Sequence, residues 1–333
     1  MKSVPLARSL VAACALLLGQ AALAAEPCAA GTSAACYLGF TPPGQSGQMH
    51  YLASPASEPK PSAALVAVHG HPRDANKTLD AALLAVQRAD ATARTLVVAP
   101  VFQVADADKC RTAGVPAEQA GDLLWTCTSW IAGEPARNAA GLTSFAAMDA
   151  LVQDLLLRWP SLRSITIAGF SAGAQMVQHY IGFAADAPAG VALRYVVADP
   201  GSWLYFDAVW QPETVAACPN IADWKYGIDK LPATLQRSAA EARARYAQAD
   251  VHYLEGALDS SAAAGTFYKI LDKSCAAQAQ GPYRLQRGLA YAEYDRSVLA
   301  PKLQRQVQVV PGCAHDVACV FPSAEARSAL LGR

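Results

Sequence analysis

The sequence predicts a three-layer α/β sandwich, in which a mostly parallel sheet carries helices on both faces. Two observations support this fold class. Short apolar runs rich in Val, Leu and Ile recur along the chain, as expected for strands that are buried on both faces. Turn residues and then a helical pattern follow most of these runs. Such alternation of strand and helix gives a parallel sheet with right-handed crossovers.

The predicted elements are placed by the apolar runs and by the helical periodicity between them. The predicted strands are 48–53, 64–68, 95–99, 164–168, 194–198, 250–254 and 306–310. The predicted helices are 79–88, 144–159, 172–184, 232–247 and 285–303. Segments 103–136 and 201–230 fit neither pattern, and we interpret them as loop insertions in a single domain of residues 25–333. In such a sheet, chemically active side chains gather beyond the carboxyl ends of the strands.

Composition excludes several classes of protein. Of the 333 residues, 53% are hydrophobic and 16% are charged, which excludes a disordered chain. The 27 basic side chains are matched by 27 acidic ones, and a nucleic-acid-binding surface needs a basic excess. We therefore expect no nucleic-acid partner, and we interpret the protein as a monomer.

The first residues have the pattern of a cleavable signal peptide. Lys2 and Arg8 precede an apolar stretch at 10–18, and Ala22-Leu23-Ala24 fits a cleavage site. The alternative is an N-terminal membrane anchor, but the stretch is too short to span a bilayer. No later segment has 18 uninterrupted apolar residues, so we expect no stable membrane span. The sequence predicts that residues 1–24 are removed from a secreted or periplasmic protein.

Eight cysteines follow the predicted signal peptide, which suits the disulfides of an exported protein. Although 105 pairings are possible, the simplest joins sequence neighbours: Cys28–Cys36, Cys110–Cys127, Cys218–Cys275 and Cys313–Cys319. A zinc site is the alternative, but the cysteines are scattered, no C-x-x-C occurs, and no histidine has ligand spacing. We expect no metal.

A candidate nucleophile follows the predicted strand 164–168. Gly169-Phe170-Ser171-Ala172-Gly173 has the G-x-S-x-G pattern, which by itself is weak. Its place between a strand and a helix is the context that a nucleophile elbow requires. The glycines permit a sharp turn, and the turn raises the serine hydroxyl above the sheet edge. We expect Ser171 to be a nucleophile.

A serine hydroxyl needs a base, and the base needs an acid to orient it. His315 follows the last predicted strand and is bracketed by Cys313 and Cys319, so it is the candidate base. Asp259 follows strand 250–254 in a Gly-x-x-Asp turn and is the candidate acid, while Asp199 after the preceding strand is the alternative.

The oxyanion formed during acyl transfer needs backbone N–H donors. We expect one from Ala172, directly after the candidate nucleophile, and one from His71 in the loop after strand 64–68. Pro72 has no N–H, which favours His71. The His69 and His71 side chains are interpreted as structural.

Together these motifs resemble the α/β-hydrolase superfamily. Val68-His69-Gly70, the elbow, Gly256-Ala257-Leu258-Asp259 and Gly312-Cys313-Ala314-His315-Asp316 carry the resemblance, which covers about residues 48–330. Within the superfamily the chain is similar to secreted esterases and polyhydroxyalkanoate-depolymerase-like hydrolases. The resemblance implies ester cleavage through an acyl-serine, without a cofactor.

Aromatic residues gather in the two insertions. Trp125 and Trp130 lie in the first, and Trp203 and Tyr205 in the second. Aromatic loops at strand ends suit an apolar or polymeric acyl group. The alternative is that the rings pack a small core within each insertion.

The sequence therefore predicts an exported serine hydrolase that cleaves carboxylic esters, including polyesters or other polymers. The same residues could cleave amides, poly(amino acid) chains or β-diketone polymers. A non-catalytic binding protein on this fold is the remaining alternative.

Overall fold

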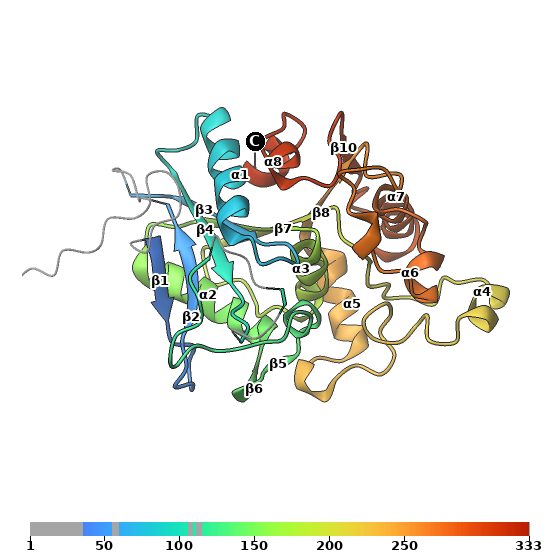
Figure 1. The fold of residues 1–333 in the computed structure, drawn as a ribbon, viewed down its shortest axis with the longest axis horizontal. Helices are drawn as coiled ribbons and strands as arrows, with labels where there is room; N and C mark the ends of the chain where they lie inside the picture. The colour runs from blue at the N-terminus through green and yellow to red at the C-terminus, as the bar shows by residue number, and fades with distance from the viewer. Residues whose placement is uncertain (1–35, 55–59, 106–108, 111–114, 333) are drawn as a thin grey trace, which may run out of the picture.

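The central sheet of the molecule has eight strands. The computed structural model describes residues 36–54, 60–105, 109–110 and 115–332. The strand order is β1-β2-β4-β3-β7-β8-β9-β10 (Figure 1). The strands are β1 (Tyr37–Phe40), β2 (Met49–Ala53), β3 (Ala63–Val68), β4 (Thr95–Val101), β7 (Ser164–Phe170), β8 (Ala192–Ala198), β9 (Asp250–Gly256) and β10 (Val307–Val310). The β1–β2 and β2–β4 pairs are antiparallel and the other pairs of this sheet are parallel, which confirms a mostly parallel sheet. The edge strand β1 was not predicted, since the first predicted strand was 48–53.

Helices cover both faces of this sheet and so form the outer layers. On one face lie α1 (Ala75–Arg88), α8 (Val317–Val320) and α9 (Arg327–Leu331). On the other lie α2 (Ser144–Arg158), α3 (Ala172–Phe183), α5 (Ala239–Gln248) and α7 (Arg284–Tyr294). Side chains of a strand alternate between the two faces. Accordingly, Val66 and Val68 of β3 pack with the α2–α3 side, while Leu65 and Ala67 pack with the α1 side. The three predicted layers are confirmed.

Three predicted helices differ from the observed ones at their ends. The helix predicted as 79–88 begins earlier, at Ala75, as α1. The segment predicted as 232–247 begins with a short 3-10 turn, η3 (Ala233–Leu235), and α5 starts later, at Ala239. The start is fixed by Ser238, whose hydroxyl accepts from the Glu241 N–H while the Glu241 carboxylate accepts from the Ser238 N–H. The helix predicted to reach residue 303 ends as α7 at Tyr294 and continues as one π turn, η5 (Asp295–Leu299).

Several short elements of the connecting segments were not predicted, since they are too short for a clear periodicity. Between β4 and α2 lie η2 (Ser129–Ala132), β5 (Pro135–Ala136) and β6 (Ala139–Thr143). After β8 lies α4 (Pro212–Ala217), and after β9 lie η4 (Tyr268–Ile270) and α6 (Cys275–Ala279). None of the helices in the described part of the chain combines the length and apolar character that a membrane span requires. The predicted signal peptide lies outside the described residues.

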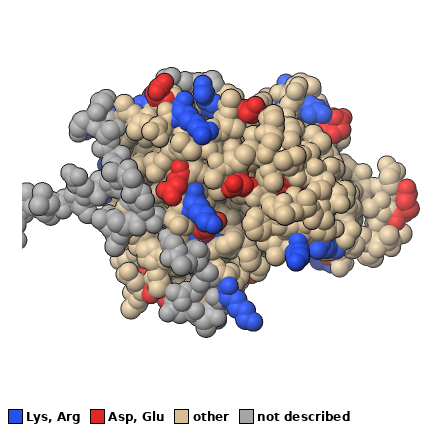
Figure 2. Space-filling view, turned by 45° about the horizontal axis from the view of Figure 1, so that its top comes forward, with Lys and Arg blue, Asp and Glu red and all other residues tan. Residues whose placement is uncertain are grey.

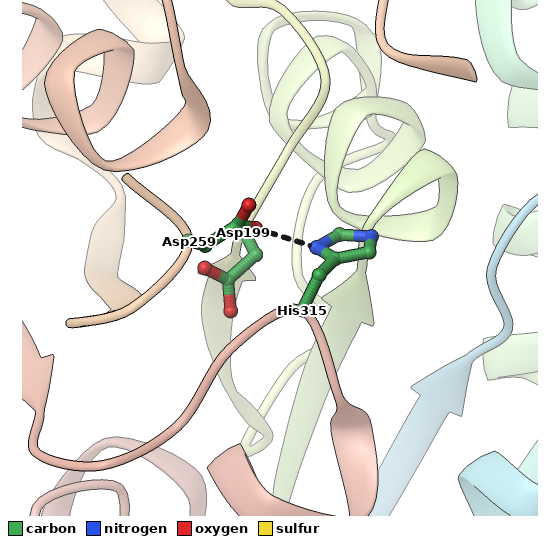
Figure 3. A group of neighbouring side chains, drawn as sticks. All are labelled: Asp199, Asp259 and His315. Atoms are coloured by element: carbon green, nitrogen blue, oxygen red, sulfur yellow. Dashed lines mark hydrogen bonds and ion pairs between the residues drawn. The ribbon is translucent and has the colours of Figure 1, made fainter. Parts of the chain in front are cut away.

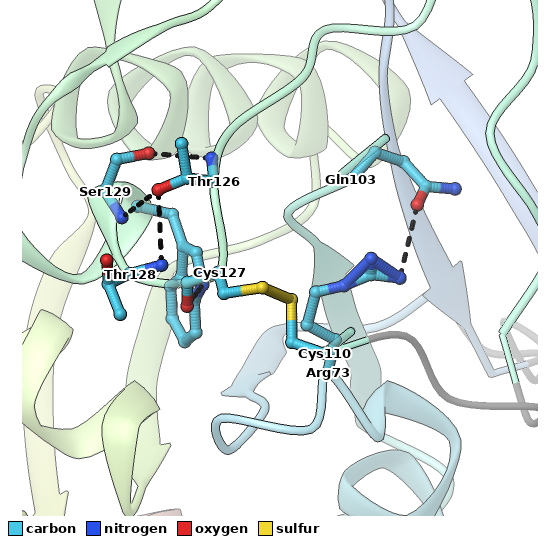
Figure 4. The surroundings of a disulfide bond; sticks show 8 residues. Arg73, Gln103, Cys110, Thr126, Cys127, Thr128 and Ser129 are labelled. Atoms are coloured by element: carbon cyan, nitrogen blue, oxygen red, sulfur yellow. Dashed lines mark hydrogen bonds between the residues drawn. A yellow bond between two sulfur atoms is a disulfide. The ribbon is translucent and has the colours of Figure 1, made fainter. Parts of the chain in front are cut away.

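Three of the predicted disulfides are present: Cys110–Cys127, Cys218–Cys275 and Cys313–Cys319. The predicted partner Cys28 lies outside the described residues. Figure 4 shows the Cys110–Cys127 bond beside Arg73, whose Nη2 donates to Gln103 Oε1 at 3.4 Å. Arg73 belongs to the turn that follows β3, where its N–H donates to the Gly70 carbonyl. The disulfide therefore lies behind the loop that carries His71.

Candidate active site

Ser171 occupies the sharp turn between β7 and α3. Its φ is +58°, a value in the left-handed region that side chains other than glycine rarely adopt. The flanking glycines are required by close packing: a β-carbon on Gly169 would collide with the Gly173 carbonyl, and one on Gly173 with the His69 carbonyl. The turn therefore presents the serine hydroxyl at the carboxyl edge of the sheet, as the G-x-S-x-G pattern predicts.

The side chains of Ser171, His315 and Asp259 form a continuous chain of hydrogen bonds. The His315 Nε2 lies 2.8 Å from Ser171 Oγ, and its Nδ1 lies 2.7 Å from Asp259 Oδ2. His315 is 6% exposed and Asp259 is 1% exposed. Figure 3 shows the imidazole directed at Asp259 from the loop that follows β10. With Nδ1 donating to the carboxylate, Nε2 is left to accept a proton from the serine.

Backbone contacts hold the loops that carry the base and the acid. The Leu258 N–H donates to the Cys313 carbonyl at 2.8 Å, and the His315 N–H donates to the Gly265 carbonyl at 3.2 Å. The Phe170 ring lies 4.8 Å from the imidazole centroid. The loops after β9 and β10 are therefore joined by backbone hydrogen bonds, and packing against Phe170 restricts rotation of the imidazole.

Burial and the hydrogen bond to Asp259 act in opposite directions on the pKa of His315. Burial lowers the pKa of His315 below its usual value of 6.5, and the nearby Arg284 guanidinium lowers it further. The hydrogen bond to Asp259 opposes both effects by favouring the imidazolium. The net shift is downward, so the imidazole stays neutral, and able to take a proton, to a lower pH than an exposed histidine.

Arg284 is a partner of the acid that the sequence did not indicate. Its Nη1 lies 3.3 Å from Asp259 Oδ1 and donates to the Thr266 carbonyl at 2.7 Å. The guanidinium is 3% exposed, so this ion pair is buried. Arg284 comes from the first turn of α7, which tertiary folding alone brings to the β9 loop, so no local pattern could reveal it.

Asp199, the alternative acid, lies behind Asp259 rather than against the histidine ring. Figure 3 shows its carboxyl directed away from the imidazole. Its Oδ1 accepts from the Gly256 N–H at 2.8 Å. Burial, with the Asp259 charge adding to it, raises the pKa of Asp199 to about 7. The structure therefore brings Asp259, the predicted acid, to the histidine.

Asp199, Asp259 and His315 also form a group of possible metal ligands, with donor atoms within 4.8 Å of one another. The atoms of Asp259 and His315 that face each other are already partnered, and so is one Asp199 oxygen. The Asp259 and His315 atoms are hydrogen-bonded to each other, and Asp199 accepts from Gly256. We therefore assign the group to the hydrogen-bond network and not to a metal centre.

A small cavity of about 130 Å³ opens beside Ser171. Gly70, His71 and Pro72 line it, together with the exposed side chains of Phe267 and Ile270. Ala172 begins α3, where the helix offers its first N–H groups no internal acceptor. The cavity is therefore lined by His71, from which we expect one oxyanion donor, and by Ser171, which directly precedes the other expected donor, Ala172.

Phe267 and Ile270 were not singled out from the sequence. They are 59% and 64% exposed, which is high for side chains of this size. Nothing in the local sequence marks them, since Tyr268 and Leu271 stand beside them and Ala262 to Ala264 come just before. They give the cavity an apolar entrance.

The expected substrate contacts of four aromatic residues are not found, and this expectation is corrected. Trp125, Trp130 and Trp203 have no exposed surface, and Tyr205 is 4% exposed. Trp130 stacks on Phe102 with centroids 5.2 Å apart, and Trp203 stacks on Tyr291 at 4.3 Å. Large aromatic rings bury a large apolar area each, so their burial in the core is strongly favoured over exposure at the site. None lines the cavity beside Ser171.

His69, next to the loop that we expect to supply an oxyanion donor, has the structural role expected for it. His69 is fully buried, with Nδ1 donating to the Gly70 carbonyl at 2.8 Å and Nε2 accepting from the Phe102 N–H at 3.3 Å. Burial lowers the pKa of His69 to about 3, so it stays neutral. Its ring ties the His71 loop to the end of β4.

No family model matches the chain, and no curated protein matches it in sequence. Solved structures do match. Poly(aspartic acid) hydrolase-1 from Sphingomonas sp. KT-1 is 20% identical with a TM-score of 0.61, over 92% of this chain and 99% of that chain. LpqC, a poly(3-hydroxybutyrate) depolymerase from Bordetella parapertussis, is 17% identical with a TM-score of 0.58, over 85% of each chain. Together with the strand order, these likenesses show that the protein has the α/β-hydrolase fold.

Proposed function

We propose that the protein is an exported serine hydrolase that cleaves uncharged carboxylic esters, with Ser171 as nucleophile, His315 as base and Asp259 as the orienting acid. The observation that carries the proposal is the unbroken hydrogen-bond chain from Ser171 Oγ through His315 to Asp259. A serine held in an elbow against a neutral imidazole is the arrangement that acyl transfer requires.

The reaction proceeds in two acyl transfers. His315 Nε2 takes the Ser171 proton while Oγ attacks the ester carbonyl carbon, and Asp259 stabilises the imidazolium. The N–H groups of Ala172 and His71 stabilise the oxyanion. The alcohol leaves with the proton from His315, and the acyl group stays on Oγ. Water then gives a proton to His315 and attacks the carbonyl carbon of the acyl-serine. The bond to Oγ breaks, the acid leaves, and His315 returns the proton to Ser171 Oγ.

The surroundings of the cavity favour an uncharged substrate. The charged residues that line it are Asp74, Lys77 and Asp316, two acids against one base. The face drawn in Figure 2 is mostly uncharged, with single acidic and basic side chains scattered over it. Because a polyanion needs a positive field, these surroundings favour a neutral acyl chain over poly(aspartic acid). The apolar rim of Phe267 and Ile270 suits such a chain.

The three disulfides support export, since such bonds persist in oxidising compartments. The signal-peptide pattern at 1–24 supports it independently.

A covalent probe tests the proposal directly. We expect a fluorophosphonate to label the purified protein at Ser171, as mapped by peptide mass spectrometry, and to leave Ser171→Ala unlabelled. Hydrolysis is then compared across p-nitrophenyl esters, polyester film and poly(aspartic acid), and we expect the neutral esters to be cleaved fastest. Labelling elsewhere, or none, would contradict the serine assignment. Fastest cleavage of poly(aspartic acid) would contradict the substrate class.

A further inference from the structure

Two buried carboxyl groups lie behind the candidate acid and have no part in the mechanism above. Ala198 and Leu254 are paired in neighbouring parallel strands, so the next residues, Asp199 and Glu255, lie side by side. Both side chains have no exposed surface. Asp199 has φ +49°, a turn that directs its Oδ1 to the N–H of Gly256 at 2.8 Å.

Three oxygen atoms of this pair are buried without a donor in the described part of the chain, and a proton between the two carboxyl groups would supply one. No N–H or hydroxyl group among the described residues donates to Asp199 Oδ2 or to either oxygen of Glu255. Because Asp199 and Glu255 lie side by side, each is the polar group available to the unpartnered oxygens of the other. An ionised carboxylate is an acceptor only, so a bond between two carboxyl groups needs one of them protonated.

The charges around the pair favour the same state. Asp259 faces it from the β9 loop, Arg284 from α7, and His315 lies beyond Asp259. Burial, with the neighbouring Asp199 charge adding to it, raises the pKa of Glu255 well above its usual value. Three buried acids face one Arg. If Asp199 and Glu255 share a proton, only two negative charges are buried beside Arg284 instead of three.

Helix α7 contacts both the carboxyl pair and the candidate acid. A β-carbon on Gly288 would collide with the Glu255 carboxyl, so that carboxyl rests directly on the helix backbone. Arg284, one turn earlier on α7, contacts Asp259. On the other side, Gly256 is held by Asp199, and its carbonyl accepts from the Asp259 N–H at 3.0 Å. The chain of contacts runs from Glu255 through Asp199 and Gly256 to Asp259.

We propose that Asp199 and Glu255 share one proton and act as positioning residues, which hold the Gly256–Asp259 turn so that Asp259 meets His315. The inference rests on the proposed function for its kinetic consequence but not for the shared proton itself. It predicts that an amide at position 255 replaces the protonated acid, because its N–H₂ group donates to Asp199 in the same way.

Two substitutions at one position test the positioning role. We expect Glu255→Ala to lower kcat by tenfold or more with KM within twofold, because the Asp259 turn loses its support while the cavity keeps its lining. We expect Glu255→Gln to keep kcat within threefold of wild type. The matched control is Asp295→Ala, which removes a buried carboxyl that Arg305 and Tyr253 hold instead. We expect Asp295→Ala to lower the melting temperature but to leave the kcat of the folded protein close to wild type.

Equal losses of kcat in Glu255→Gln and Glu255→Ala, at equal melting temperatures, would overturn the positioning role. So would a fall in Asp295→Ala as large as that in Glu255→Ala, because general destabilisation would then explain both.

Infrared spectroscopy tests the proton without using activity. The wild-type minus Glu255→Gln difference spectrum should contain the carbonyl stretch of one protonated carboxylic acid at neutral pH, and this band should shift in ²H₂O. A spectrum without the band would overturn the shared proton. This test does not need Glu255→Ala, so it remains decisive even if that variant does not fold. If wild type shows the band but does not react with a fluorophosphonate, the proposed function fails and the shared proton stands.

Discussion

The loops after β7, β9 and β10 differ sharply from the two insertions, 103–136 and 201–230, although all follow the carboxyl ends of strands. In the former, Ser171, Asp259 and His315 contact one another at the edge of a cavity. In the latter, Trp125, Trp130 and Trp203 are buried in the main core. Ser171, Asp259 and His315 follow their strands within a few residues, so these polar side chains stay at the sheet edge. A long insertion buries its large rings. A position after a strand end therefore indicates a functional residue when the side chain is polar and follows the strand directly. It does not do so for the large aromatic residues of the insertions.

Loss of the nucleophile should give the largest effect of any substitution in the strand-end turns. We expect Ser171→Ala to lower ester hydrolysis by on the order of 10⁶, because removal of such a nucleophile leaves the rest of the site unable to act. The measurement is kcat with a p-nitrophenyl ester, with circular dichroism and thermal unfolding as controls for the fold. A variant that keeps a tenth of wild-type activity would contradict the role of Ser171.

The acid should rank next. We expect Asp259→Asn to lower kcat by about 10⁴, because an amide favours the wrong imidazole tautomer. Asp199→Asn should cost far less, because its amide oxygen still accepts from Gly256 and its N–H₂ still donates to Glu255. The two variants are compared for kcat at equal ester concentrations. If Asp199→Asn were the more damaging, the acid would belong to β8.

The sequence could predict what depends on short-range order and not what depends on tertiary contact. The apolar runs place the strands, and glycine spacing places Ser171, because both are local properties of the chain. Glu255 reads as one more residue of a strand, and Arg284 as one more residue of a helix. Their roles exist only after β8, β9 and α7 meet. The aromatic residues mislead for the same reason, since the partner rings Phe102 and Tyr291 are distant in sequence.

An insertion ring should show the opposite pattern of effects. We expect Trp130→Ala to lower the free energy of unfolding by about 3–5 kcal/mol, as for other fully buried large rings. The kcat of the fraction that remains folded should stay close to wild type, because the ring does not line the cavity. Denaturant unfolding and active-site titration measure the two quantities. A large loss of kcat per titrated site at unchanged stability would place Trp130 in the substrate site.

The pH dependence should reflect the environment of the base. Activity needs neutral His315, so kcat/KM should rise with pH through the pKa of His315 in the free enzyme. Burial lowers that pKa, so the midpoint should lie below 6.5. Because the Arg284 charge also lowers it, Arg284→Gln should move the midpoint to higher pH. A midpoint above 6.5 in wild type, or a downward shift in Arg284→Gln, would contradict this account.

The smallest expected effect concerns the disulfide that brackets the base. Cys313 and Cys319 are bonded six positions apart, with His315 inside the loop that they close. Cross-linking so short a loop adds little global stability, because the entropy that the bond removes from the unfolded chain rises with loop length. Its stronger effect is local. The Cys313 carbonyl accepts from the Leu258 N–H, so the bond also steadies the contact between the His315 and Asp259 loops.

We therefore expect replacement of both Cys313 and Cys319 by Ser to lower kcat by roughly threefold to tenfold, since small misplacements of a catalytic group are costly. Activity should be lost on heating before global unfolding begins. The control is replacement of Cys218 and Cys275, a bonded pair 57 positions apart whose loop includes Asp259 but keeps it well away in sequence from either cysteine. Its removal should lower the melting temperature more, since it closes the longer loop, and kcat less. Equal kcat in both double variants would make the Cys313–Cys319 bond a general staple, and the short turns would then owe their order to hydrogen bonds alone.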